Sequence, residues 1–288
     1  MPARRQPWTA RQRLPFLLVA VPAGFLLAFF VAPTAFLLSI SFVESDGMVP
    51  TGGFTTDNFA DLFGSRLYTG AILRSFIIGA LVGVLVVLLA YPLAYWLVRT
   101  TSRWRNWLIA LSLSPLLASV IVRTYGWWVV LNREGVLNSA LLRLGLIEAP
   151  LQLLPSVGAI VIGLAHALLP YGVLSIIATL NGLDPALERA AMSLGASRTR
   201  TFLAVTLPLT LPGIAGGFLL AFAIAISAYA TPAILGGPAT EVMATLIRTL
   251  MLVQLDWALG SAMAAVLLAS SIVLLVLTTL AGGRVRTA

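Results

Sequence analysis

The sequence predicts an all-α integral membrane protein with six transmembrane helices. Hydrophobic residues make up 59% of its 288 residues and charged residues only 10%, whereas soluble domains average about 45–50% apolar residues. Six segments contain no Asp, Glu, Lys or Arg, and each is near or above the roughly 20 residues that cross a bilayer. Because hydrocarbon offers backbone polar groups no water, we expect these segments to be helices. None shows the alternating pattern of an outer-membrane barrel strand.

Prolines and one arginine mark the limits of the expected spans. The first span carries Pro22 and Pro33, the third is interrupted near its outer end by Arg123, and the fifth lies between Pro208 and Pro232. The six expected spans are residues 16–42, 72–98, 106–131, 156–181, 208–232 and 257–283.

The arginines predict the orientation, because basic residues collect on the cytoplasmic side of a membrane protein. All 18 basic residues are Arg. Placing both termini in the cytoplasm puts most of them inside and all of the acids but Asp184 and Glu188 outside. The inner arginines are Arg4, Arg5, Arg11, Arg13, Arg99, Arg103, Arg105, Arg189, Arg198, Arg200, Arg284 and Arg286. The net charge of +8 is therefore a topology signal, and we expect no nucleic-acid partner.

The composition also excludes several kinds of chemistry. Without Cys there is no disulfide and no thiolate metal site. His166 is the only histidine, and a lone His without nearby acids is expected to be hydrogen-bonded in the packing and not to bind metal. We expect no catalytic residue and no metal on this chain. The absence of lysine excludes a Walker A phosphate loop, so any ATP must be bound by another subunit.

The segment between spans four and five predicts a short cytoplasmic helix with a defined end. Asp184 suits the N-cap, Pro185 the first helical position and Gly195 the left-handed residue that ends a helix. Ser197 can cap a second short helix that leads to Pro208. Small and aliphatic residues recur at helical spacing: Leu183, Leu187, Ala190, Ala191 and Leu194. Such a stripe fits either a groove on a partner protein or the lipid surface.

This segment resembles the EAA signature of binding-protein-dependent ABC importer permeases. That signature is Glu-Ala-Ala, three residues, Gly, nine residues, an aliphatic residue, any residue and Leu-Pro. The positions that follow the pattern are Ala190, Ala191, Gly195, Val205, Leu207 and Pro208. Arg189 stands where the family has Glu, and Glu188 comes one position early. The departure puts in doubt any salt bridge carried by that Glu, so shape is expected to carry the contact.

Over nearly its whole length the chain resembles the spermidine/putrescine permease group within this family. The segments that carry the resemblance are 123–127, 135–138, 150–154, 169–170, 231–237 and 256–260. The resemblance implies a type I ABC importer transmembrane domain. Residues 1–66 would be the N-terminal segment, first helix and periplasmic loop, and residues 67–288 a core of five helices with a coupling helix at about 184–200.

The resemblance implies a permease subunit of the inner membrane that imports a small solute and is not itself an enzyme. Polyamines are the favoured solute, with opines, aminophosphonates and oxyanions as alternatives. An ion-coupled secondary transporter is a further alternative. The implied partners are two cytoplasmic ATPase subunits, a second permease chain, related or identical, a periplasmic binding protein and membrane lipid. No cofactor is expected on this chain, while ATP and Mg would lie on the ATPase. The residues expected to couple to it are Glu188, Arg189, Ala190, Ala191, Gly195, Ala196, Ser197, Leu207 and Pro208.

A cationic substrate would meet acids and aromatic faces at the outer end of the path. Aromatic rings hold cations through their negative faces, and carboxylates attract them directly. The candidate path residues are Arg123, Tyr125, Tyr229, Glu241, Asp256 and Trp257. Two simpler interpretations stay open: Arg123 can extend to the outer headgroups, and Glu241 and Asp256 can be solvated loop acids.

Overall fold

The computed structural model describes the backbone of residues 19–45 and 50–285. The arginines predicted at the N-terminus, Arg4 to Arg13, and Arg286 lie outside the described residues. Within them, five helices are long and apolar enough to cross a membrane. These are Val19–Ile40, α4 (Arg66–Arg99), α8 (Val157–Asn181), the helix Arg198–Ser227 and α14 (Trp257–Val285). The expected spans one, two, four and six are therefore confirmed.

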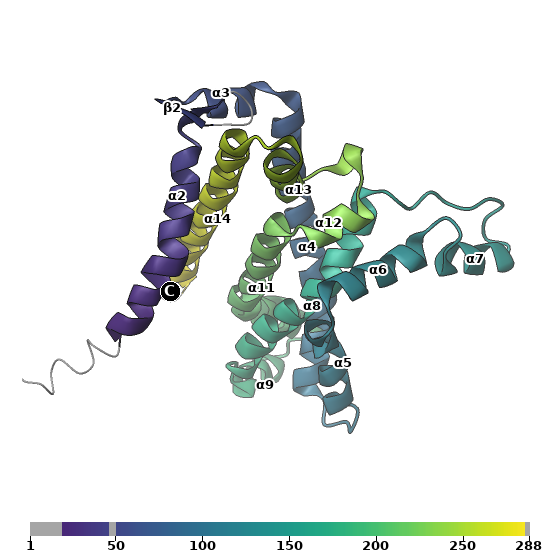
Figure 1. Ribbon diagram of the computed structural model, residues 1–288. Coiled ribbons are helices and arrows are strands. Elements are labelled where there is room, and N and C mark those ends of the chain that lie inside the picture. The colour runs from purple at the N-terminus through teal and green to yellow at the C-terminus, as the bar shows by residue number, and fades with distance from the viewer. Residues whose placement is uncertain (1–18, 46–49, 286–288) are drawn as a thin grey trace, which may run out of the picture.

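Three of these helices form the centre of the molecule. Helices α4, α8 and α11 (Leu207–Ser227) pack against one another along their lengths, while α2 (Ala32–Ile40) and α14 stand together at one side (Figure 1). The buried core between the three includes Val82, Val86, Leu164, Ala167 and Ala221. Glycines allow the close approach: a Cβ atom at Gly172 of α8 would lie 2.6 Å from Cγ1 of Val86.

A small outer layer follows the first helix. Strands β1 (Val43–Ser45) and β2 (Pro50–Phe54) pair antiparallel, and this two-stranded hairpin is an exception to the expected all-α fold. Helix α3 (Asp57–Gly64) then buries Leu62 completely. Leu62 joins a cluster with residues of α4, α14 and α13 (Met243–Arg248), so this layer is packed onto the helix ends.

The expected third span is wrong as a single helix. The segment forms α5 (Arg105–Leu117) and α6 (Val120–Leu131), and α5 makes an angle of 103° with the segment that starts at Val120. Ala118 has an extended backbone conformation and ends α5. The 13 residues of α5 are about two turns fewer than a transmembrane span needs. Pro115 lies in the last turn of α5, where the final carbonyl groups lack helical partners. The guanidinium of Arg123 donates to the carbonyl oxygen of Pro115 and so bridges the break. This contact replaces the expected extension of Arg123 to the outer headgroups.

The fifth span also differs from the expected 208–232. It begins with α10 (Arg198–Thr201) and the π turn η2 (Phe202–Thr206), and α11 ends at Ser227. Proline lacks the N–H that an α-helix needs, and the π turn lets the helix continue into Pro208 by bonding Leu207 N to Phe202 O. After an extended Ala228, the chain forms a separate short helix, α12 (Ala230–Leu235).

Candidate functional site

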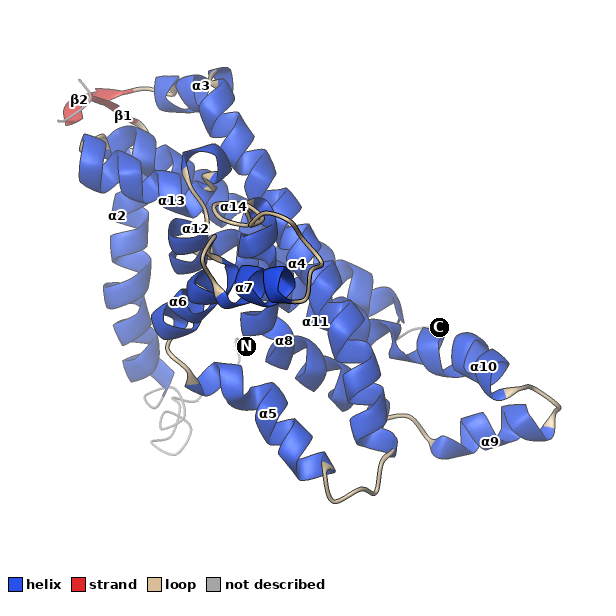
Figure 2. Cartoon of the chain, turned by 90° about the vertical axis from the view of Figure 1, so that its right-hand side faces the viewer, coloured by secondary structure: helices blue, strands red, loops and turns tan. Residues whose placement is uncertain are grey.

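The elbow, the segment that links α8 to α11, forms helix α9 (Pro185–Ser193) and then α10, which lie together at the end of the bundle opposite α3 (Figure 2). Asp184 Oδ1 accepts from Ala186 N at 2.8 Å, which confirms the predicted N-cap. Ser197 Oγ accepts from Arg200 N at 3.3 Å and caps α10, as predicted. Side-chain caps of this kind satisfy amide groups that a helix start leaves without partners.

Gly195 ends α9 in the left-handed region, at φ +88°. Its N–H donates to Met192 O at 3.0 Å, and Ala196 N donates to Ala191 O at 3.1 Å. These two bonds define a Schellman turn, which needs a residue with positive φ. The stop predicted from the sequence is therefore confirmed, together with its chemical cause.

Glu188 fastens α9 to the rest of the bundle. Its carboxylate forms an ion pair with Arg99 at the end of α4 and accepts a hydrogen bond of 2.7 Å from Thr206 Oγ1 in η2. The guanidinium of Arg99 also lies 5.7 Å from the ring centre of Tyr95. Glu188, one position before the Glu of the signature, thus carries a salt bridge within this chain; that shape carries the contact with a partner stays a prediction. Arg99 and Thr206 were missed because nothing in the local sequence links α9 to α4.

An aromatic cluster supports the same junction. Tyr91 and Tyr95 of α4 both meet Phe202 edge-on, with ring centres 5.8 and 5.5 Å apart. The Tyr91 hydroxyl lies 3.0 Å from Thr210 Oγ1 of α11. The elbow, α4 and α11 are therefore joined by packing and hydrogen bonds.

The predicted apolar stripe of the elbow is divided between two environments. Leu183 packs against the core cluster and Ala191 is half-buried, whereas Ala190, Leu187 and Leu194 are exposed, Leu194 by 90%. Of the other predicted coupling residues, Arg189 and Ser197 are exposed, Ala196 is half-buried, and Leu207 and Pro208 begin α11. Since the exposed members have no partner in the described chain, they form a surface available to another molecule.

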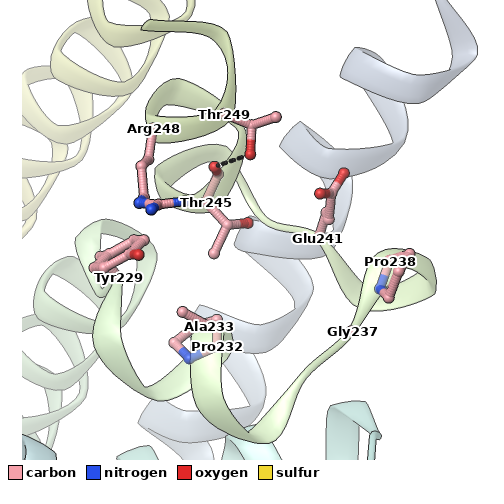
Figure 3. Close-up of a pocket in the computed structure, with 9 residues that line it drawn as sticks. All are labelled: Tyr229, Pro232, Ala233, Gly237, Pro238, Glu241, Thr245, Arg248 and Thr249. Carbon is pink, nitrogen blue, oxygen red and sulfur yellow. Dashed lines mark hydrogen bonds between the residues drawn. The ribbon is translucent and has the colours of Figure 1, made fainter. Parts of the chain in front are cut away.

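A pocket of about 210 Å³ lies at the opposite end, between α12 and α13 (Figure 3). It brings together two of the predicted path residues, Tyr229 and Glu241. The backbone oxygen of Glu241 accepts from Arg74 Nε at 2.9 Å, which fixes this loop to α4. The remaining lining residues are Pro232, Ala233, Gly237, Pro238, Thr245, Arg248 and Thr249.

Arg248 and Thr245 are pocket residues that the sequence did not reveal. Figure 3 shows the guanidinium of Arg248 beside Tyr229, with the carboxylate of Glu241 across the pocket. From the sequence, Arg248 counted only as an outer basic residue, because nothing in its spacing connects it with Glu241. The pocket is therefore lined by a carboxylate, a guanidinium and hydroxyl groups, and not by acids alone.

The other predicted path residues lie elsewhere. Asp256 is not among the pocket residues: its Oδ1 accepts from Leu259 N at 3.0 Å and caps α14. Trp257 is the first residue of α14 and is half-exposed. Arg123 bridges the break between α5 and α6, and Tyr125 of α6 is exposed. Of the two acids expected to flank the path, Glu241 therefore lines the pocket and Asp256 caps a helix; a role for either in substrate entry stays a prediction.

His166 has the hydrogen bond that the sequence predicted, but its side chain is exposed and not packed in the interior. Trp127 Nε1 donates to His166 Nδ1 at 3.1 Å, and the two rings meet edge-on. In the part of the chain that the structure describes, no group of three His, Cys, Asp or Glu residues is placed to hold a metal ion.

Comparison with known proteins decides the family. The spermidine/putrescine transport system permease protein PotB of Haemophilus influenzae is 31% identical over 245 residues, 85% of each chain. The chain belongs to the permease subunits of ABC importers. PotB of Escherichia coli is 30% identical over 85% of this permease and 89% of its own length. The inner membrane ABC transporter permease YdcU of the same organism is 32% identical over 66% of this chain and 64% of its own. No profile of a known protein family matches the chain.

Solved structures support the same fold. A bacterial ABC transporter that imports the acidic polysaccharide alginate has a chain that superposes with a TM-score of 0.79 over 95% of this permease and 96% of that chain. The same transporter type, bound to an alginate-loaded periplasmic protein, gives 0.76 over 96% of each chain. At 18% identity these likenesses concern the fold alone. The family and the apolar helices place this permease in the inner membrane, with several spans.

Proposed function

We propose that this permease imports a small organic cation, of the polyamine class, and is driven by a separate ATPase that docks on the elbow of α9 and α10. A second permease chain would complete the path, and a periplasmic binding protein would deliver the solute to the outer loops. ATP and Mg would be bound by the ATPase alone. The proposal keeps both termini in the cytoplasm, which puts the elbow on the inner side and the pocket on the outer side.

The observation that most supports ATPase docking is that α9 is held in one position against the bundle. Glu188, Arg99 and Thr206 hold one face of α9 against the bundle, and the Schellman turn at Gly195 sets its length. The opposite face carries exposed small side chains, including Ala190. Small residues allow a helix to enter a groove closely. Because α9 is tied to α4 and η2, closure of paired ATPases can rotate these helices as rigid bodies.

The direct test is uptake by the reconstituted system. Vesicles containing this permease, its partner permease and the ATPase should accumulate labelled spermidine only when ATP and the loaded binding protein are both present. Unlabelled putrescine should compete, while alginate-like sugars and sulfate should not. ATP-independent uptake that follows a proton or sodium gradient would contradict the proposal and indicate a secondary transporter.

Glu241 is expected to contribute to the entry of a cation. Replacing Glu241 by Gln should raise the KM for spermidine about fivefold, the effect of roughly 1 kcal/mol for a partly solvated charge contact. Glu134→Gln is the matched control, since Glu134 is an exposed acid of the loop between α6 and α7 (Val136–Arg143), outside the pocket. Equal KM values for Glu241→Gln and the unmodified permease would show that the carboxylate does not meet the substrate.

Arg248 in the same pocket favours a second candidate substrate class. A guanidinium repels a polyamine but attracts a carboxylate or phosphonate. A solute that carries both an amine and an acid, such as an opine or an aminophosphonate, would match Glu241 and Arg248 at once. Competition by these compounds, with none by spermidine or putrescine, would decide for this class.

A further inference from the structure

Both acids on the predicted cytoplasmic side are already engaged within the chain. Asp184 accepts from the amide of Ala186, and Glu188 binds Arg99 and Thr206. Apart from the exposed carboxylate of Asp184 at the start of α9, the outward charge of the elbow comes from arginines. Three of them, Arg189, Arg198 and Arg200, are exposed, and none has an ion pair or a side-chain hydrogen bond with the residues that the structure describes.

The helical period of α9 shows which residues face outward. Successive residues are rotated by about 100°, and Glu188 points toward the bundle. Ala186, Ala190 and Ser193 then lie on the opposite face, with Arg189 along one edge and Leu194 along the other. All five of these outward residues are exposed. The elbow thus presents a shallow, small-residue face that is bordered by one guanidinium on one edge and by the large aliphatic side chains of Leu187 and Leu194 on the other.

This pattern specifies the chemistry of the surface that covers it. We propose that the ATPase groove that receives α9 is acidic, and that an Asp or Glu of the groove pairs with Arg189. The inference rests on the proposed docking of the ATPase at the elbow. A carboxylate binds a guanidinium through two parallel hydrogen bonds, which also fixes the orientation of the helix. Opposite a signature that carries Glu at this position, the groove would be expected to be positively charged. Opposite Arg189, we expect the groove to be negatively charged.

Anionic lipid headgroups could attract the same arginines, but the geometry favours a protein partner. Arg189 lies along the edge of the outward face of α9, and Glu188 on the side toward the bundle keeps that outward face turned away from it. The elbow also lies at the end of α8 and α11 and not along their sides (Figure 2). A surface that projects from the end of the helices is placed to meet a cytoplasmic protein.

Charge reversal at Arg189 gives the first test. The assembled complex is purified in detergent through a tag on the permease, and the retained ATPase is measured at low and high salt. Arg189→Glu should retain about tenfold less ATPase than the unmodified chain, and Arg189→Gln an intermediate amount. Arg133→Glu, the same change at an exposed arginine of the α6–α7 loop, should retain the normal amount. Salt should weaken retention by the unmodified permease more than by Arg189→Gln.

A conservative variant gives a second test that does not depend on disrupting the elbow. Because the chain has no lysine, Arg189→Lys adds its only side-chain amine. A carbodiimide joins that amine to a carboxylate in contact with it, forming an amide while the reagent takes up the water. We expect an adduct between permease and ATPase, whose fragments identify an Asp or Glu of the groove. Arg133→Lys should give no such adduct.

Three results would overturn the acidic groove, each in a distinct way. If Arg189→Glu retains the normal amount of ATPase while Ala190→Glu loses it, docking stands but the groove is not acidic at this position. If neither change affects retention, the proposed docking itself is wrong. If Arg189→Glu lowers transport only in vesicles that contain phosphatidylglycerol, with normal ATPase retention, Arg189 contacts lipid.

Discussion

Replacing Gly172 by leucine is expected to prevent stable packing of the central helices. A Cβ atom at this position would lie 2.6 Å from Cγ1 of Val86 and 3.1 Å from Cβ of Ala90, both fully buried in α4. Gly217 of α11 approaches from the other side, since its own Cβ would lie 3.2 Å from Cα of Gly172. Overpacking typically costs about 1–3 kcal/mol, and more where backbones must separate. Here a leucine would have to move α4 away from α8.

The measurement is the yield and thermal midpoint of the purified permease. Gly172→Leu should lower the midpoint by at least about 5 °C or abolish recovery of monodisperse protein. Gly158→Leu is the matched control in the same helix, because the nearest atom to a Cβ there is Ser156 Oγ, at 3.8 Å. If both variants are recovered with equal midpoints, the contact between the central helices is looser than the structure indicates.

The sequence predicted those features that are determined by local composition. Runs of apolar residues identified four spans closely, and capping residues identified both ends of α9 through Asp184 and Gly195. These signals are local because a span depends on hydropathy over about 20 residues and a cap on a few neighbours. The family resemblance rested on the elbow segment and on other short segments along the chain, and it is confirmed by relatives that match most of the chain.

Features that depend on partners far apart in the sequence were not predictable in the same way. Glu188 and Arg99 are 89 positions apart, and only the packing of α4 against α8 brings them together. The break at Ala118 depends on packing with the rest of the fold, because Pro115 alone is also compatible with a kinked but continuous span. Likewise, Asp256 was grouped with Glu241 because both were predicted to be acids on the outer side of the membrane. In the structure, the carboxylate of Asp256 accepts from a backbone amide and caps the start of α14.

Gly195→Val is expected to weaken docking of the ATPase, and with it uptake, while leaving the spans intact. The residue has φ +88° and open space around its Cα, so the obstacle to valine is conformational and not steric crowding. A left-handed conformation costs a residue with a Cβ about 1–2 kcal/mol, and a β-branched side chain more. The Schellman turn would open, and α9 would extend or detach from α10. We expect uptake and retained ATPase to fall about tenfold or further.

Two other variants separate this mechanism from general damage. Gly195→Asn should retain most ATPase, because Asn tolerates the left-handed conformation better than other residues with a Cβ. Gly126→Val places the same side chain in open space in α6, at a glycine without positive φ, and should leave ATPase retention unchanged. If Val and Asn at position 195 behave alike, the turn does not control docking. If ATPase retention falls for Gly195→Val but not for Gly195→Asn, docking requires the left-handed conformation at this residue. That conformation then determines how Ala190 and Arg189 are presented, because both lie within the helix that this turn ends.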